Sequence, residues 1–210
     1  EAFINMLAFL GWNPGDSQEI FSIDELIRSF SIERVNKSGA RFNFQKMLWF
    51  NQQYLRLKSN EELAQMSQQF ILNSKILHDK KYILQAISII KERITFPQDI
   101  FTEGSYLFFL PEIYDEKTVR KKWNNDSVNH LKSLLEKIKL VTDFDATTIE
   151  KLFQDYLDLN EVGFGKVMPA LRLSVTGKGM GPSMFLIMEL LGKEEVLNRI
   201  ENSLITLGNG

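Results

Sequence analysis

The stretch ALRLSVTGKGMGPSMFLIMELLGKEEVLNRIENSL, residues 170–204, decides how this chain folds. Apolar residues recur at helical spacing on both sides of a short glycine-rich segment, so the pattern predicts a helix, a loop and two further helices. The loop carries Lys178 and leads into a helix, which is a place where proteins often hold negatively charged groups. We therefore expect a helical domain whose binding surface includes this loop.

The rest of the chain repeats the helical pattern, with almost no strand-like alternation and no internal repeat. Ser22 and Glu25 have the spacing of a capping box, and Pro97 and Pro111 mark breaks. The fold class is therefore predicted to be mainly α. The predicted helices span residues 2–11, 22–30, 44–57, about 60–77, about 80–94, 126–140 and 145–160.

Composition describes an ordinary folded protein. Of 210 residues, 44% are hydrophobic and 25% charged, and the formal net charge is −2, which argues against a uniformly basic nucleic-acid coat. The absence of cysteine excludes disulfides and thiolate metal sites. No apolar run approaches the roughly 20 residues of a membrane span. Because the sequence runs from Glu1 straight into an apolar helix, we expect it to be part of a longer protein.

Catalytic patterns are missing. His78 and His130 lie in separate helical segments without metal-ligand spacing, so both are predicted to be structural or solvent-facing. The segment TGKGMGPS, residues 176–183, differs from a nucleotide-binding P-loop because Lys178 follows the first glycine and a helix precedes it. The chain is predicted to hold no catalytic residue and no metal.

Two blocks of sequence carry a family resemblance. Residues 2–56 contain, in order, a helix ending in LGW, the stretch EIF, the loop KSGARF and the helix KMLWFN. Residues 165–204 form the second block, GKVMPALRLSVTGKGMGPSMFLIMELLGKEEVLNRIENSL. In this order the two blocks resemble bacterial-type class I glutamyl-tRNA synthetases, discriminating or non-discriminating, without their catalytic Rossmann domain.

The resemblance implies the organisation of the chain and its role. It implies a stem-contact helical region over 1–57 and an all-helical anticodon-binding cage with subdomains 58–125 and 126–210. The parent enzyme would use ATP and Mg²⁺ to attach glutamate to tRNA(Glu), whereas this chain alone would be inactive and hold no cofactor. The resemblance also implies a cytoplasmic monomer that binds neither DNA nor a membrane.

The same resemblance implies which residues contact tRNA. Arginine suits base reading because it combines hydrogen bonding with planar stacking, and Pro182 is expected in the first turn of its helix. The residues implied to read the anticodon are Arg172, Arg93, Gly181, Pro182 and Met184. The residues implied to meet the tRNA backbone are Lys37, Arg41, Lys178, Arg120 and Lys121.

Other conspicuous side chains are expected in the core. Trp12 and Trp49 are predicted to be buried, and the aromatic segment Phe101–Phe109 is predicted to be core rather than a stacking platform. Three methionines, at positions 180, 184 and 188, are predicted to fill gaps between helices.

Three other classes of protein are weighed against this interpretation. An all-helical protein-interaction module would require repeats or an exposed apolar groove, and repeats are absent. A small helical enzyme would require a convergent polar cluster. The glutaminyl branch of the same superfamily uses β-barrels for the anticodon, which disagrees with the helical pattern of this C-terminal half.

Overall fold

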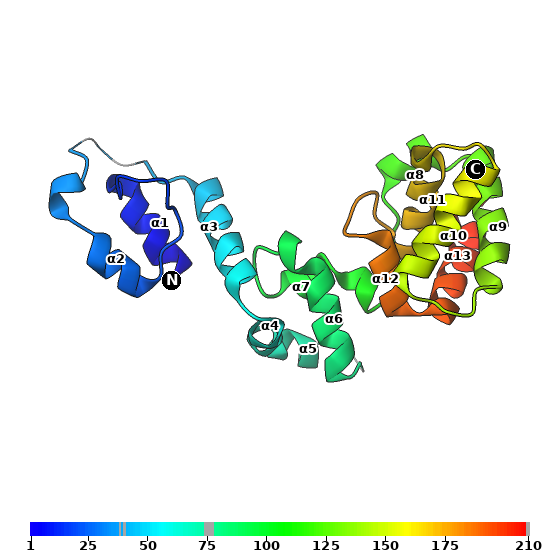
Figure 1. Ribbon diagram of the computed structural model, residues 1–210, viewed down its shortest axis with the longest axis horizontal. Coiled ribbons are helices and arrows are strands. Elements are labelled where there is room, and N and C mark those ends of the chain that lie inside the picture. Colours follow the sequence, from blue (N-terminus) through cyan, green and yellow to red (C-terminus); the bar gives the residue numbers. More distant parts are fainter. Residues whose placement is uncertain (38, 40, 74–77, 209–210) are drawn as a thin grey trace. The chain divides into compact units, whose positions relative to one another are not determined.

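The computed structural model describes residues 1–37, 39, 41–73 and 78–208, and it confirms a mainly α fold (Figure 1). Among these residues there is no strand, only an isolated bridge between Trp12 and Val35. The described chain forms the α-helices α1 Ala2–Gly11, α2 Ile23–Ser29, α3 Phe44–Leu57, α4 Asn60–Met66, α5 Gln68–Asn73, α6 Lys80–Ile90, α7 Asp99–Thr102, α8 Glu116–Lys122, α9 Asn125–Lys139, α10 Ala146–Leu159, α11 Phe164–Thr176, α12 Met184–Leu191 and α13 Lys193–Leu207. Short 3-10 helices span Ile32–Arg34, Lys91–Arg93 and Ser105–Leu107.

The chain divides into two compact units. Unit 1 comprises residues 1–77 and 90–103, and unit 2 comprises residues 78–89 and 104–210. The chain therefore passes from one unit to the other three times. No helix among the described residues combines the length and the apolar character that a membrane crossing needs.

The core of unit 1 forms where α1 packs on α3. Met6 on α1 and Phe50 on α3 are buried together, and Phe9 makes tilted ring contacts with Phe50 at 5.8 Å and with Phe21 at 5.9 Å. A buried polar link reinforces this packing, because the Asn5 side-chain oxygen accepts hydrogen bonds from the Phe21 backbone N–H and the Tyr54 hydroxyl, each 2.8 Å long. Burial of one face of each helix in this interface thus stabilises α1 and α3.

Capping signals confirm two helix starts in unit 1. Ser22 and Glu25 form the predicted capping box at the start of α2. Asn43 accepts a hydrogen bond from the Lys46 N–H at the start of α3, as the sequence predicts.

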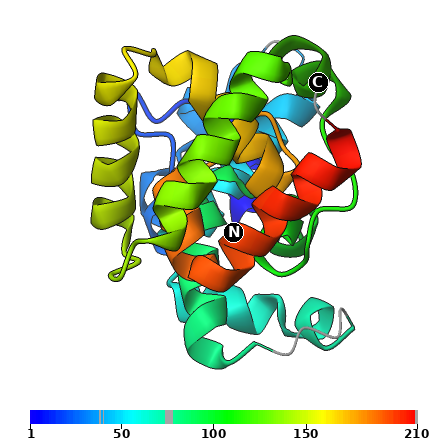
Figure 2. The same cartoon turned by 90° about the vertical axis from the view of Figure 1, so that its right-hand side faces the viewer.

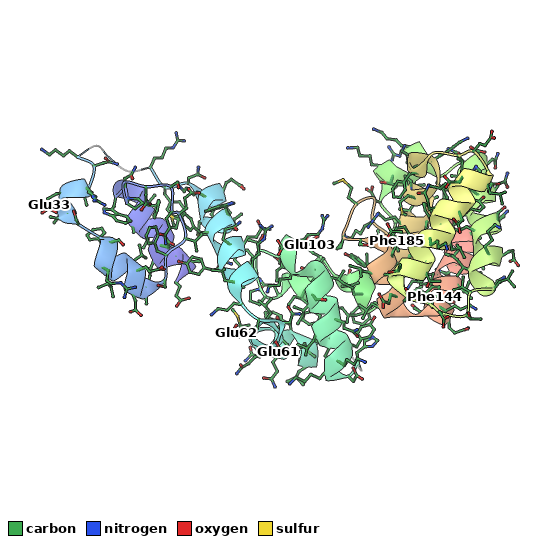
Figure 3. The ribbon with its side chains drawn as sticks, in the orientation of Figure 1. Glu33, Glu61, Glu62, Glu103, Phe144 and Phe185 are labelled. Atoms are coloured by element: carbon green, nitrogen blue, oxygen red, sulfur yellow. The ribbon has the colours of Figure 1, made fainter. Side chains whose placement is uncertain are left out.

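The helical pattern predicted over about 60–77 forms two helices in its described part, α4 and α5, with a break at Ser67. Ser59 and Glu62 form a capping box at the start of α4, where Glu62 lies in the first turn (Figure 3). Ser67 then ends α4 because its buried hydroxyl donates to the Pro97 carbonyl oxygen, 3.0 Å away, and α5 starts directly after it. Residues 74–77 of the prediction lie outside the described residues, as do Ser38 and Ala40 of the predicted KSGARF loop.

The prediction for the tryptophans is half right. Trp12 is buried and packs edge-on against Phe9, with ring centroids 5.7 Å apart. Trp49 is 37% exposed on α3, although it touches Phe50, so its assignment to the core is wrong. Residue type alone does not decide which face of a helix turns inward.

Unit 2 is a bundle in which α9, α11 and α13 pack on one another, and α10 packs on α12. Figures 1 and 2 show α9 and α13 side by side. Helix α9 starts at Asn125, one residue before the predicted Asp126, because Asn124 and Ser127 form a capping box. The predicted cap of α10 is confirmed, since Asp145 accepts from the Thr148 N–H at 3.0 Å.

A buried arginine joins three elements of unit 2. Arg199 on α13 is 2% exposed, and its Nη1 donates to the Tyr106 carbonyl oxygen at 2.5 Å and to the Val175 carbonyl oxygen at 2.9 Å. Its Nε bonds Glu195 one helical turn earlier, 2.7 Å away. A buried charge is tolerated only when such hydrogen bonds replace water. This cation therefore fixes the end of α11 against the segment before α8.

We expect Arg199→Met to lower the free energy of unfolding by roughly 2–4 kcal/mol, because the two carbonyl oxygens lose their charged donor. The matched control is Arg120→Met on α8, which breaks a Glu–Arg pair of the same spacing on the exposed surface and should cost less than about 1 kcal/mol. Urea unfolding combined with hydrogen exchange of the α11 and α13 amides measures both. Equal losses in the two variants would contradict a structural role for the buried arginine.

Candidate functional site

The site is built on the loop between α11 and α12, residues 177–183. Helix α11 ends at Gly177, which adopts a left-handed conformation with φ +69° and donates its N–H to the Leu173 carbonyl oxygen at 2.8 Å. A Cβ atom here would lie 2.5 Å from the Ile113 carbonyl oxygen. The Gly177 carbonyl oxygen also accepts from the Asp115 N–H, 2.8 Å away. Only glycine satisfies this turn, so the loop leaves α11 in a fixed direction.

The middle of the loop presses against the first turn of α8. A Cβ atom on Gly179 would lie 2.1 Å from the Thr118 hydroxyl oxygen and 2.7 Å from an Asp115 carboxylate oxygen. Asp115 is the N-cap of α8, and its carboxylate accepts a hydrogen bond from the Thr118 hydroxyl. This hydrogen bond lowers the pKa of Asp115 below its usual value. The loop and the helix cap thus share one surface without room for a side chain.

The far end of the loop lies on Arg172, which the family resemblance implies to be a base reader. Arg172 is half-buried on α11, and its Nη2 donates to the Pro182 carbonyl oxygen at 2.8 Å. A Cβ atom on Gly181 would lie 2.8 Å from the Arg172 Nη1. Three of the five predicted anticodon residues are therefore brought together in unit 2.

The loop alternates between buried and outward positions. Gly177, Gly179 and Gly181 face the protein, where a Cβ atom would collide with it. Lys178 and Met180 between them are exposed, and Met180 is 83% exposed, so its predicted role as a core gap-filler is wrong. The other two methionines in that prediction, at positions 184 and 188, are buried as expected.

Helix α12 begins later than the sequence suggests. Its N-cap is Ser183 and its first residue is Met184, so Pro182 precedes the cap and is not in the first turn. The Met184 side chain is buried, which leaves its backbone as the part that lies beside the loop. Phe185 follows inward and makes a tilted ring contact with Phe153 of α10 at 5.8 Å.

The remaining predicted residues are all exposed, but they are distributed over both units. Arg93 ends the 3-10 helix Lys91–Arg93 in unit 1, and the stem-region residues Lys37 and Arg41 are also in unit 1. Arg120 and Lys121 lie on α8 in unit 2, in the last turn of that helix. The structure therefore unites the loop and α8 but leaves Arg93 in the other unit.

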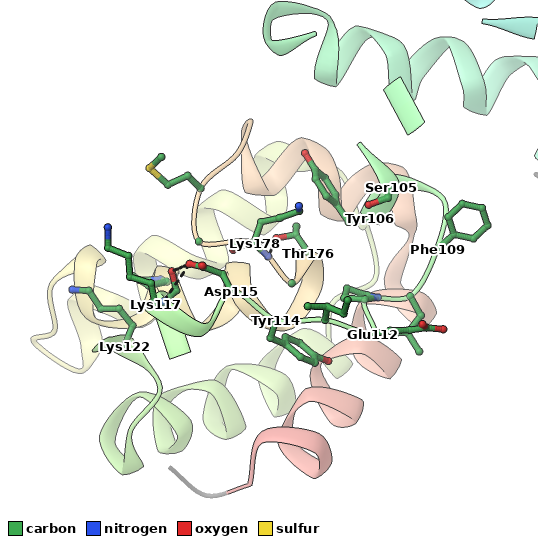
Figure 4. A pocket seen from close by; sticks show the side chains of 18 of the residues that line it. Ser105, Tyr106, Phe109, Glu112, Tyr114, Asp115, Lys117, Lys122, Thr176 and Lys178 are labelled. Atoms are coloured by element: carbon green, nitrogen blue, oxygen red, sulfur yellow. Dashed lines mark hydrogen bonds between the residues drawn. The ribbon is translucent and has the colours of Figure 1, made fainter. Parts of the chain in front are cut away.

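A cavity of about 970 Å³ opens beside the loop within unit 2 (Figure 4). Its walls come from the segment before α8, from α8 itself and from residues 176–180. In Figure 4, Lys117 and Lys122 extend to one side of the cavity, and Phe109 and Glu112 lie on the other. Two residues singled out in the sequence, Lys121 and Lys178, line it together.

The aromatic segment is mostly core, with one exception that matters for the site. Phe101, Tyr106 and Phe108 are buried, as predicted. Phe109 is 44% exposed and lines the cavity. One side chain of this segment is thus placed where a ligand could contact it.

The described residues offer neither a metal site nor a nucleotide-phosphate loop. Across the described ranges, no group of three or more His, Asp or Glu side chains could hold a metal ion. Residues 170–176 before the loop are helical, whereas a P-loop follows a strand. His130 is engaged with the Tyr156 hydroxyl, 2.8 Å from its Nδ1. The described residues therefore do not fit ATP or Mg²⁺.

Sequence reasoning missed two parts of the site. Arg199 is not singled out by the sequence, because its burial follows only from the packing of α13. The contact of Gly179 with Asp115 and Thr118 joins residues far apart in the chain. Glycine at every second position, 177, 179 and 181, is the one sequence signal for close packing on one side of the loop.

Comparison with known proteins identifies relatives along almost the whole chain. The sequence profile of the family described as anticodon binding domain matches residues 62–204. The chain is 40% identical over 207 residues to the glutamate–tRNA ligase of Flavobacterium psychrophilum, and 38% identical over 208 residues to that of Porphyromonas gingivalis. Each match covers 99% of this chain and 41% of the relative, so the chain spans less than half of their length.

Solved structures agree with the sequence relatives. A glutamate tRNA ligase from Elizabethkingia meningosepticum, in complex with its amino acid, superimposes with a TM-score of 0.88 at 40% identity. That match covers 99% of this chain and 41% of the other. A glutamate–tRNA synthetase from Elizabethkingia anophelis gives a TM-score of 0.85, also at 40% identity, over 98% of this chain and 40% of the other.

We expect Gly179→Ala to lower the free energy of unfolding by roughly 1–3 kcal/mol, because the added methyl group overlaps the Thr118 hydroxyl. Gly165→Ala on α11 is the matched control, since a Cβ atom there meets nothing within 4 Å, and it should raise stability by about 0.5–1 kcal/mol. Thermal and urea unfolding measure both. A Gly179→Ala variant as stable as the parent would show that the loop does not press on α8.

Proposed function

The chain belongs to the anticodon binding domain family, and on that premise we propose that it binds tRNA by reading its anticodon, as part of a glutamate–tRNA ligase. The observation that carries the proposal is the Arg172 guanidinium held by Pro182 of the glycine loop. The whole ligase would attach glutamate to tRNA(Glu) with ATP and Mg²⁺, using residues outside this chain. The role of the present residues is to hold the RNA.

The proposed reading surface comprises Arg172, Gly181, Pro182 and Met184. A guanidinium carries five N–H donors in a fixed fork, so the bond to Pro182 sets the direction of the whole group. Unstacked bases are recognised by hydrogen bonds on their edges and by stacking on planar groups such as arginine. Glycine at position 181 lets a base approach the backbone closely.

Arg93 is proposed as a second base reader, from unit 1. It is exposed at the end of its 3-10 helix, and it carries the same planar guanidinium as Arg172. The family profile includes it, because the match begins at residue 62.

Exposed lysines and arginines are proposed to meet the RNA backbone. Such contacts supply affinity that falls with salt and carries no sequence information. The residues proposed for this role are Lys37, Arg41, Arg120, Lys121 and Lys178. Because the formal net charge of the chain is −2, RNA would be attracted by local basic patches of this kind and not by the protein as a whole.

The proposed organisation assigns residues 1–57 to the stem-contact region, with residues 58–125 and 126–210 as the two helical subdomains of the anticodon cage. The family profile over 62–204 supports the proposed start of the cage, because its match begins near residue 58. The ligase is proposed to act as a cytoplasmic monomer.

We expect Arg172→Ala to remove roughly 1–3 kcal/mol of preference for an anticodon stem-loop with the glutamate anticodon over one with an altered triplet. Arg172→Lys should fail to restore it, because an ammonium group lacks the planar fork. Fluorescence titration at low and moderate salt measures both, with Arg28→Ala, an exposed arginine on α2, as the control. Equal binding of the two stem-loops by the wild type would overturn the proposed function.

Gly181→Ala provides a second test of the same surface. The added methyl group would displace the Arg172 guanidinium, the flexible end of that side chain, so stability should change by less than about 0.5 kcal/mol. When Gly181→Ala is introduced into the wild type, affinity for the cognate stem-loop should fall. When it is introduced into the Arg172→Ala variant, affinity should not fall further, because the two changes remove the same contact. Additive losses would show that Gly181 acts independently of Arg172.

A further inference from the structure

The cavity beside the glycine loop lies outside the proposed reading surface. None of Arg172, Gly181, Pro182 and Met184 lines it. Loop residues 176–180 form one of its walls and then continue directly into Gly181. At about 970 Å³ it falls at the upper end of the range of about 300–1,000 Å³ typical of pockets that hold a whole small ligand. The loop thus borders two different surfaces, the proposed reading surface at residues 181–182 and the cavity at residues 176–180.

The cavity is lined by apolar side chains that remain in contact with solvent. Met180 and Ile113 are more than four-fifths exposed, and Phe109 and Leu110 are partly exposed. None of these four side chains belongs to the buried core of the described residues. Apolar and aromatic surfaces of this kind are what an unstacked base covers when it leaves its own strand.

The cavity is also rich in positive charge. Four lysines line it, at positions 117, 121, 122 and 178, against two carboxylates, Asp115 and Glu112. Asp115 is engaged as the cap of α8. Within the part of the chain that the structure describes, none of the four lysines is in an ion pair, whereas Lys58, Lys139 and Lys166 are. Lys117 also acts electrostatically on the Asp115 carboxylate, so the charge available to a ligand comes from the other three lysines. Lysines outside ion pairs at the rim of an apolar cavity favour an anionic ligand with an apolar face.

We propose that this cavity is an additional RNA subsite, which takes the nucleotide immediately next to the anticodon triplet. Its base would lie against Met180 and Phe109, and its phosphate would meet Lys121 and Lys178. Because an RNA strand is continuous, a nucleotide next to one held at Gly181 and Pro182 can reach the other side of the same loop. The proposal rests on the proposed function, and it adds a fourth nucleotide to the triplet.

The test uses the full chain and three stem-loops that all carry the glutamate anticodon. One is intact, one lacks the base 5′ of the triplet, and one lacks the base 3′ of it. We expect one abasic stem-loop to bind wild type at least about fivefold more weakly than the intact one. Met180→Ser should bind intact and abasic stem-loops equally, because it removes the surface that the base covers. Leu140→Ser, at an equally exposed apolar residue outside the cavity, should keep the difference.

The phosphate contacts are tested by salt dependence. Lys121→Ala combined with Lys178→Ala should reduce the slope of log affinity against log salt by about 1.4, that is, about 0.7 for each lost contact to a single strand. Lys151→Ala, an exposed lysine on α10 that does not line the cavity, should leave the slope unchanged.

Three results would overturn the proposal and can be told apart. If wild type prefers the cognate triplet but binds both abasic stem-loops like the intact one, the subsite fails and the proposed function stands. If wild type shows no triplet preference, both fail. If cytidine or uridine monophosphate binds saturably, loses binding in the double lysine variant and the abasic stem-loops bind normally, the cavity holds a free nucleotide instead.

Discussion

A single buried cation organises unit 2. Arg199 reaches from α13 to the Val175 carbonyl oxygen near the end of α11 and to the Tyr106 carbonyl oxygen in the segment before α8. Val175 is two residues before the glycine turn, and Tyr106 lines the cavity. The root of the loop and a wall of the cavity therefore depend on the same charge. Because a buried guanidinium must keep its hydrogen bonds, neither element can shift without leaving donors or acceptors unsatisfied.

The glycine loop receives its shape from the elements that it touches. Gly177 turns the chain against Ile113, and Gly179 lies on the capping pair Asp115 and Thr118. A binding surface fixed in this way loses little conformational freedom when a ligand arrives, which is the advantage of preorganisation. A flexible loop of the same composition would have to become ordered when its ligand binds.

Local signals in the sequence predicted the helices well, because caps and periodicity act over a few residues. The capping box at Ser22 and the start of α3 after Asn43 are two examples. Burial was harder to predict, because it depends on which distant segments meet. Trp49 and Met180 are exposed against expectation, and Ser67 ends a helix through a bond to Pro97, thirty positions away in the chain.

The candidate site likewise has one part that the sequence indicated and one part that only the folded structure shows. The loop and Arg172 were found from the sequence because a family resemblance marked them, and the structure brings them together. The cavity could not be found in this way, because its lysines and apolar residues come from separate segments that meet only in the folded bundle. The roles of these residues in binding are proposals for experiment.

The alternation in the loop has a consequence for how this surface can evolve. Positions 177 and 179 are confined to glycine, whereas Lys178 and Met180 present side chains that the fold does not need. A descendant lineage can therefore exchange charge, size or shape at these outward positions in single mutational steps and keep the same backbone path. The backbone conformation of the loop is thus kept while its outward side chains change. Ligand preference can therefore change without a loss of stability.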